Sequence, residues 1–280
     1  MRVGVIFRCF SKSYDGVANQ ITELMEGIDR ILSLRSDLPP LAKINVAIPV
    51  GDMFVDTDCG ETWKALIRAL ADKSLLNLVD VQETVLGILS GAVNATVAQQ
   101  LSRGCTHSLI ISTTCNSMIT EKNLAAMFRA FDSGAKVAGL TLPDPVMEEL
   151  VLAGCITNTF AMWELVPLIS VGGFVMWQEN RFKNERYNHY VQGANGDYPI
   201  SGLEIPTLGE LRRYYGQCIA PIMAPDQGDW KMPDKDKEPQ KCLRELDKRN
   251  SKWPRHHATA ALGGFDLSYI RTGILPGYPK

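Results

Sequence analysis

The sequence predicts an α/β fold in which a mostly parallel β-sheet is flanked by helices. Two observations support this prediction. Short β-like runs recur through the first half of the chain, and the first of them, Val3–Phe7, is continuously apolar, as in a strand that is buried on both faces. Amphipathic helical patterns separate these runs. Strands and helices that alternate at this spacing are typical of an open, mostly parallel sheet.

Five strands and four helices are expected in this half. The strands cover residues 3–7, 44–48, 78–81, 109–111 and 137–140. Apolar residues at helical spacing mark the helices at residues 21–32, 63–70, 92–101 and 124–131. Gly104 and Gly134 follow the last two of these helices, where glycine commonly ends a helix.

The pattern changes after about residue 142. Asp144 followed by Pro145 predicts the start of a short helix, because Asp is a good N-cap and proline fits the first helical position. Residues 161–169 are a second candidate helix. Apolar spacing predicts a third helix from about Leu208 to Tyr215.

The segment 226–257 is dense in charge, with nine Lys and Arg against seven Asp and Glu. We expect a mobile loop with a short helix near residues 241–249. The predicted organisation is therefore one domain at residues 1–222 and a charged loop, lid and tail at residues 223–280, packed on the same domain.

Charge and cysteine usage exclude several classes of protein. The 280 residues include 29 Lys and Arg against 31 Asp and Glu, so no extended nucleic-acid-binding or anionic-membrane surface is expected. The seven cysteines are scattered without a Cys-x-x-Cys pair, which argues against a disulfide framework or a zinc site. A reducing cytoplasm is the expected location. Polar residues and glycines interrupt the apolar stretch 154–177, so we expect core and no transmembrane segment.

Parallel sheets of this kind bind ligands beyond the carboxyl ends of their strands. Several short motifs follow the predicted strands in order, and others occur later in the chain. They are Arg8-Cys9-Phe10-Ser11, Asp56-Thr57-Asp58-Cys59-Gly60-Glu61-Thr62, Gly91-Ala92-Val93-Asn94, Ser170-Val171-Gly172-Gly173-Phe174 and Gly202-Leu203-Glu204. Together these motifs resemble a GT-A-fold nucleotide-sugar transferase, most similar to family 2 glycosyltransferases. The resemblance runs from Val3 to about Ile222.

The resemblance implies transfer of a sugar from a nucleotide-diphosphate sugar to an acceptor, with inversion at the anomeric centre. It implies roles for particular residues by their place in the motifs. The catalytic base is Glu204; the nucleotide-sugar-binding residues are Arg8, Phe10, Asp56, Asp58, Asn94, Thr114 and Asn116; the acceptor side is Gly172, Gly173 and Phe174; and the lid residues are Arg255, His256 and His257. The acceptor class stays open among glycan, lipid, protein and modified nucleic acid.

The sequence departs from the family at the metal motif. Family members usually place Asp-x-Asp after the central strand, where the carboxylates hold Mg²⁺ or Mn²⁺. This chain has Ser112-Thr113-Thr114-Cys115-Asn116 there. Asp56 and Asp58 spell Asp-Thr-Asp but follow the second strand. Three interpretations stay open: the cation is absent, its ligands come from elsewhere, or catalysis has been lost.

Each candidate also has an ordinary interpretation. Glu204 is equally well explained as a surface acid beside a helix start, and Arg8 as part of a surface salt bridge. A simple turn is favoured for Asp56, whereas ligand contact is favoured for Asp58. For the adjacent residues His256 and His257, exposure to solvent is favoured over a role in a lid.

Three classes of function remain. The first is a glycosyltransferase in which Arg8, Arg255 or a cation would stabilise the leaving diphosphate. The second is a catalytically degenerate GT-A-like protein that binds a nucleotide or glycan or serves as a scaffold. The third is a nucleotidyltransferase, which needs a glycine-rich, lysine-bearing loop that Lys12 and Gly16 only faintly resemble.

Overall fold

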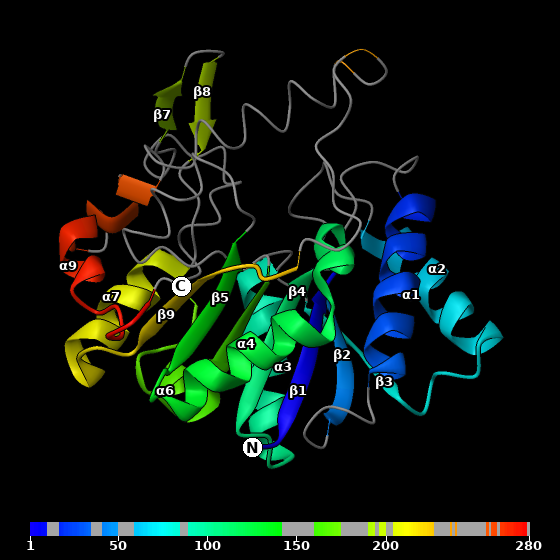
Figure 1. The fold of residues 1–280 in the computed structure, drawn as a ribbon. Coiled ribbons are helices and arrows are strands. Elements are labelled where there is room, and N and C mark those ends of the chain that lie inside the picture. The colour runs from blue at the N-terminus through cyan, green and yellow to red at the C-terminus, as the bar shows by residue number, and fades with distance from the viewer. Residues whose placement is uncertain are drawn as a thin grey trace.

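The computed structural model describes residues 1–9, 17–34, 41–49, 59–84, 89–141, 160–174, 190–193, 196–199, 204–226, 236, 239, 256–257, 259–261 and 264–278. Within these residues a seven-stranded sheet has the order β3-β2-β1-β4-β6-β5-β9 (Figure 1). Its strands are β1 (Val3–Arg8), β2 (Leu41–Pro49), β3 (Val79–Thr84), β4 (His107–Ser112), β5 (Val137–Thr141), β6 (Phe160–Glu164) and β9 (Ile219–Met223). Only β6 runs antiparallel to its neighbours, so the mostly parallel sheet is confirmed.

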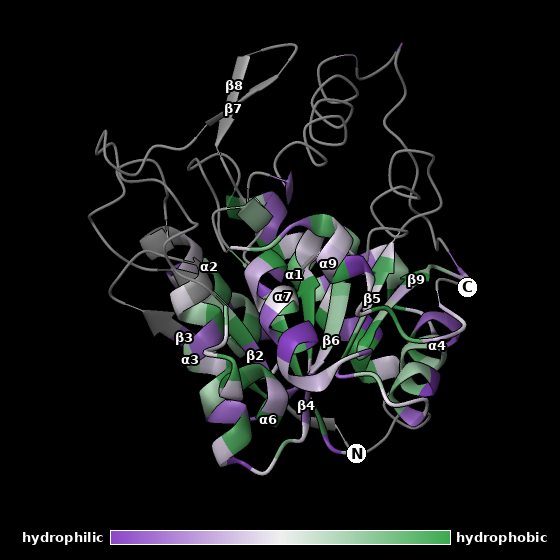
Figure 2. Cartoon of the chain, turned by 90° about the vertical axis from the view of Figure 1, so that its left-hand side faces the viewer, coloured by the Kyte–Doolittle hydropathy of each residue, from purple (hydrophilic) through white to green (hydrophobic). Residues whose placement is uncertain are grey.

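Helices cover both faces of this sheet. They are α1 (Val17–Ser33), α2 (Cys59–Asp72), α3 (Leu89–Ser102), α4 (Glu121–Asp132), α6 (Leu165–Ser170), α7 (Glu204–Tyr215) and α9 (Leu267–Arg271), with a 3₁₀ turn η2 (Thr113–Met118) after β4. Buried residues of α1, α2 and α4 form one core with one face of the sheet. Those of α3, α6, α7 and α9 form a second core on the other face. Figure 2 shows the strands coloured mainly as hydrophobic between helices of mixed colour.

The predicted helix at residues 161–169 is wrong in its first half. Phe160–Glu164 is strand β6, inserted between β4 and β5, and only Leu165–Ser170 is helical. The apolar run at residues 160–163 is buried whichever element forms, so periodicity could not separate strand from helix. The backbone hydrogen bonds of two flanking strands select the strand. The predicted helices beginning at Asp144 and at residues 241–249 lie outside the described residues.

The end of the chain lies against the last strand. Ile274 forms a parallel bridge with Ile219, and the Leu275 N–H donates to the Ile219 carbonyl at 2.9 Å. A separate hairpin joins β7 (Tyr190–Gly193) and β8 (Gly196–Pro199). None of the helices in the described part of the chain combines the length and the hydropathy that a membrane crossing needs.

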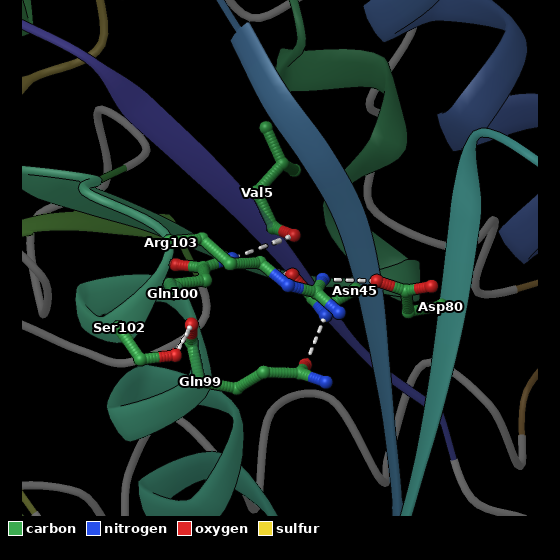
Figure 3. A network of polar contacts seen from close by, with 7 residues as sticks. All are labelled: Val5, Asn45, Asp80, Gln99, Gln100, Ser102 and Arg103. Atoms are coloured by element: carbon green, nitrogen blue, oxygen red, sulfur yellow. Dashed lines mark hydrogen bonds and ion pairs between the residues drawn. The ribbon is translucent and has the colours of Figure 1, made fainter.

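A buried polar network ties α3 to the sheet (Figure 3). Asn45 donates to Gln99 Oε1 at 2.7 Å and accepts from Gln100 at 3.0 Å. Gln100 also donates to the Val5 carbonyl at 3.3 Å, and Gly4 leaves the space that its side chain fills. Because the Asn45 and Gln100 side chains are buried, these amides fix the position of α3 on β1 and β2.

Replacing Asn45 with leucine should lower the free energy of unfolding by about 2 kcal/mol, because the Gln99 and Gln100 amides lose their partner in a buried place. Urea unfolding measures this change. Ser102→Ala is the control, since the exposed Ser102 hydroxyl bonds only within α3, to Gln99 O at 2.8 Å. Its effect should stay within about 0.5 kcal/mol. Equal losses in the two variants would contradict the role of the network.

His107 begins β4 at the amino edge of the sheet. Its ring meets Phe131 edge-on at 4.7 Å, and its Nδ1 lies 2.8 Å from the Thr106 hydroxyl. Burial lowers the pKa of His107 below its ordinary value near 6.5, and Glu164 partly opposes this effect.

The unfolded chain therefore takes up this proton at higher pH than the folded protein. The contribution to stability is fully present above about pH 6.5 and is lost as pH falls toward the lower folded pKa of His107. His107→Gln should remove this component from unfolding free energies measured between pH 5 and 8. Ser102→Ala, which removes no titratable group, should keep the wild-type pH profile. An unchanged profile in His107→Gln would contradict the prediction.

Candidate functional site

The carboxyl ends of β1 and β4 lie side by side in the middle of the sheet. Arg8, the last residue of β1, is in register with Ser112, the last residue of β4. Two residues earlier, Ile6 is in register with Ile110, and both are buried in the core beneath α3. Because side chains alternate along a strand, Arg8 and Ser112 point to the same face of the sheet as this pair. The cationic side chain of Arg8 and the hydroxyl side chain of Ser112 thus lie next to each other at the carboxyl edge of the sheet.

Thr114 joins this position from the η2 turn. Its hydroxyl lies 3.0 Å from the Ser112 hydroxyl, and its side chain is exposed, whereas Arg8 is half-buried. Two of the residues predicted to bind the nucleotide sugar, Arg8 and Thr114, therefore lie near each other at the end of the two central strands. Ser112, which lies in the segment that replaces the family's metal motif, connects the two: it is in register with Arg8, and its hydroxyl contacts that of Thr114.

Asn116 contacts α1 instead. Its amide nitrogen donates to the Glu23 carbonyl, and its Oδ1 fills the space that a β-carbon at Gly27 would need. In the same turn, the Thr113 hydroxyl accepts a hydrogen bond from Gln20 of α1. These contacts hold η2 against α1. The predicted role of Asn116 toward a sugar nucleotide stays a prediction.

Asn94 joins two of the predicted motifs. Its Nδ2 donates to the Phe174 carbonyl at 2.8 Å, and the Phe174 N–H donates to its Oδ1 at 2.9 Å. The preceding residue, Gly173, has a φ of +72°, and a β-carbon there would lie 2.8 Å from Asn94 Oδ1. The Phe174 ring meets Trp163 edge-on at 5.0 Å in the core. The Gly172–Phe174 turn is therefore held by α3 and β6.

Helix α7 completes this junction. The Thr207 hydroxyl donates to the Gly173 carbonyl at 2.9 Å. Glu204 is the first residue of α7, one turn before Thr207, and only 6% of it is exposed. A carboxylate is favourable at this place, because the first turn of a helix carries partial positive charge. Glu204, the predicted base, thus lies on the helix that binds the predicted acceptor turn. Because Glu204 is buried, its alternative interpretation as a surface acid is wrong.

Asn123 holds the first residue of the charged segment. It is buried in the first turn of α4, and its amide nitrogen donates to the carbonyls of Met118 at 2.8 Å and Asp226 at 2.7 Å. The Asp226 N–H donates back to Asn123 Oδ1 at 3.0 Å. The segment 226–257 therefore begins beside η2. No local sequence pattern marks this contact, since Asn123 follows the Thr120 N-cap and looks like an ordinary first-turn residue.

The remaining predicted residues have mixed outcomes. His256 is 4% exposed, so the favoured interpretation of a solvated side chain is wrong for it, whereas His257 is exposed. Apolar residues nearby in the chain, such as Ala260 and Leu267, belong to the core and explain how this stretch becomes buried. Phe10, Asp56, Asp58 and Arg255 lie outside the described residues.

The described residues do not form an evident metal centre. Among them, no three His, Cys, Asp or Glu side chains gather in a way that could hold a metal ion. Burial raises the pKa of the Cys218 thiol to about 11 and also raises that of Cys105, so neither is a ready thiolate ligand.

Comparisons with known proteins place the fold. No known family model matches the sequence, and no curated protein matches it. The structure is similar to that of a mannosyltransferase from Pyrobaculum calidifontis in complex with GDP-Man and Mn²⁺, with a TM-score of 0.53, 14% identity, and coverage of 97% of this chain and 69% of that one. A putative nucleotide-diphospho-sugar transferase from Desulfovibrio desulfuricans G20 is matched at a TM-score of 0.40 and 11% identity over 90% of this chain and 97% of that one. The chain therefore has a GT-A-like, nucleotide-diphospho-sugar transferase fold.

Proposed function

We propose that this protein is a glycosyltransferase, similar to family 2, which transfers a sugar from a nucleotide-diphosphate sugar. One observation supports the proposal most. The predicted acceptor turn at Gly173 is bonded on one side to Asn94 of α3 and on the other to Thr207, one turn from Glu204. Three motifs that are far apart in the sequence thus meet on one face of the sheet.

In this proposal the sugar nucleotide lies along the carboxyl edge of the sheet. The Arg8 guanidinium pairs with the diphosphate oxygens, for which its planar donors are suited. Glu204 takes the proton of the acceptor hydroxyl as that oxygen attacks the anomeric carbon. The nucleoside diphosphate leaves from the opposite side, so the anomeric centre is inverted.

The fold family implies Mg²⁺ or Mn²⁺ at the end of β4. Hard divalent cations prefer carboxylate oxygens, but the residues at this strand end are Ser112, Thr113 and Thr114. Within the described residues, this donor set does not fit a firmly held divalent cation. The proposed chemistry is therefore assigned to the side chains of the protein alone.

A screen of UDP-, GDP-, CDP- and dTDP-sugars tests the function, with and without Mn²⁺. A ligand that binds the native state raises the melting temperature, and release of the nucleoside diphosphate reports turnover. We expect one nucleotide class to stabilise the protein and to be consumed when a suitable acceptor is added. If no sugar nucleotide stabilises the protein under either condition, the proposal is wrong.

The second candidate is a non-catalytic sugar-nucleotide-binding protein with the same fold. The neutral Ser112–Thr114 sequence at the metal-motif position favours it. Stabilisation by a sugar nucleotide without release of the diphosphate, across a panel of glycan, lipid and protein acceptors, would support this candidate over the enzyme.

A further inference from the structure

We infer that the diphosphate site at the carboxyl ends of β1 and β4 works without a divalent cation, and that the Arg8 guanidinium supplies the positive charge there. This inference rests on the proposed function, because it concerns the same site. It differs from the family expectation at one point, the source of the charge that faces the diphosphate.

The oxygen donors at the end of β4 are neutral and partly engaged. Ser112 and Thr114 contact each other through their hydroxyls at 3.0 Å. The Thr113 hydroxyl accepts from Gln20, and the Asn116 amide donates to the Glu23 carbonyl of α1. The end of this strand therefore presents two hydroxyls to a ligand. Hydroxyls can donate to phosphate oxygens, but they do not replace the charge of two carboxylates toward Mg²⁺ or Mn²⁺.

Arg8 brings a permanent positive charge to the same place. It is paired in register with Ser112 on the neighbouring strand, and neighbouring strands lie about 4.8 Å apart. The like charge of the Arg8 side chain would disfavour a divalent cation beside Ser112. A diphosphate would be attracted to it and could accept two parallel N–H bonds. The residues at this edge thus suit an anion.

The backbone of an acidic residue, Asp226, lies near this turn. Asn123 fixes the backbone of Asp226 beside Met118 at the end of η2. Asp226 on its own is a poor substitute for the paired carboxylates of a metal motif, and the described residues provide no group of three metal-binding side chains.

Calorimetric titration of the full chain with GDP, UDP, CDP and dTDP tests the inference, in EDTA and in Mn²⁺. The diphosphate that binds should do so with dissociation constants that agree within about threefold under the two conditions, and its binding should weaken as salt rises. Arg8→Gln should weaken binding at least about tenfold, the effect of losing a charge-assisted pair, whereas Arg8→Lys should retain part of it. The matched control is Arg2→Gln, just before the opposite end of β1, which should bind like the wild type.

A variant with both Ser112→Asp and Thr114→Asp tests the position directly. Two carboxylates beside Arg8 should repel the diphosphate in EDTA, and Mn²⁺ should restore part of the lost affinity. If this variant behaves like the wild type under both conditions, the diphosphate does not lie at the end of β4, and the inference fails.

The failure of the inference and the failure of the proposed function give different results. Wild-type binding that EDTA abolishes and Mn²⁺ restores overturns the metal-free site and leaves the proposed function standing. Binding of no diphosphate and no sugar nucleotide under either condition overturns both. Metal-independent binding that survives Arg8→Gln overturns the assignment of the charge to Arg8.

Discussion

Glu204→Gln should lower the rate of sugar transfer at least about 100-fold, the loss that follows removal of a positioned general base. Glutamine has nearly the same shape and can still form hydrogen bonds, but it cannot accept the proton of the acceptor hydroxyl. Glu204 is buried at the start of α7, so its position is defined by the packing around it. Steady-state release of the nucleoside diphosphate, with the donor and acceptor found by screening, measures the effect.

The control is a second glutamate of the same helix. Glu210 lies two turns further along α7 and forms a 3.8 Å ion pair with Arg213. Glu210→Gln should leave transfer within about twofold of the wild type, because exposed ion pairs contribute little. Binding of the nucleoside diphosphate should be equal in both variants. Wild-type turnover in Glu204→Gln would exclude Glu204 as the base.

Gly173→Ala should lower the free energy of unfolding by about 3 kcal/mol. Part of the loss, about 1–2 kcal/mol, comes from an L-residue forced into the left-handed region at a φ of +72°. The rest arises because the new methyl group would lie 2.8 Å from Asn94 Oδ1 and would displace the amide from Phe174. Chemical denaturation measures the sum.

Two further variants separate these causes. Gly172 has a φ of +90°, and no heavy atom of the described residues lies within 4 Å of the position of a β-carbon, so Gly172→Ala should show the backbone cost alone. In the Asn94→Ala background, the cost of Gly173→Ala should fall toward that of Gly172→Ala, a coupling of about 1–2 kcal/mol. Independent, additive losses would mean that Asn94 does not hold this turn.

The parallel core of the fold could be predicted from the sequence. Strand β1 is a continuous apolar run apart from Arg8, β2 and β4 have apolar centres, and α1, α2 and α4 have apolar residues at helical spacing, so local pattern and final burial agree. Strand β6 could not be predicted. Its pairing with β4 and β5 depends on residues far away in the sequence, and the apolar run at residues 160–163 suits a buried helix equally well.

The sequence predicted which residues belong to the candidate site better than it predicted the contacts between them. The order of motifs named Asn94, Gly173, Phe174 and Glu204. Only the tertiary structure reveals their contacts. Asn94 binds the backbone of Phe174, and Thr207 binds Gly173. Hydrogen bonds from a helix to a backbone segment tens of residues away leave no local periodicity, and for this reason Thr207 and Asn123 were missed.

The sequence by itself determined the order of strands and helices up to β5 and the neutral residues Ser112–Thr114 at the position of the metal motif, because both are properties of consecutive residues. Only the tertiary structure decided which groups share that position. The parallel register of β1 and β4 sets Arg8 beside Ser112, although 104 positions separate them in the chain. Asn116, four residues after Ser112, is instead turned into α1 by a buried hydrogen bond. Register and packing act through space, and they decide whether adjacent residues face a ligand or the core.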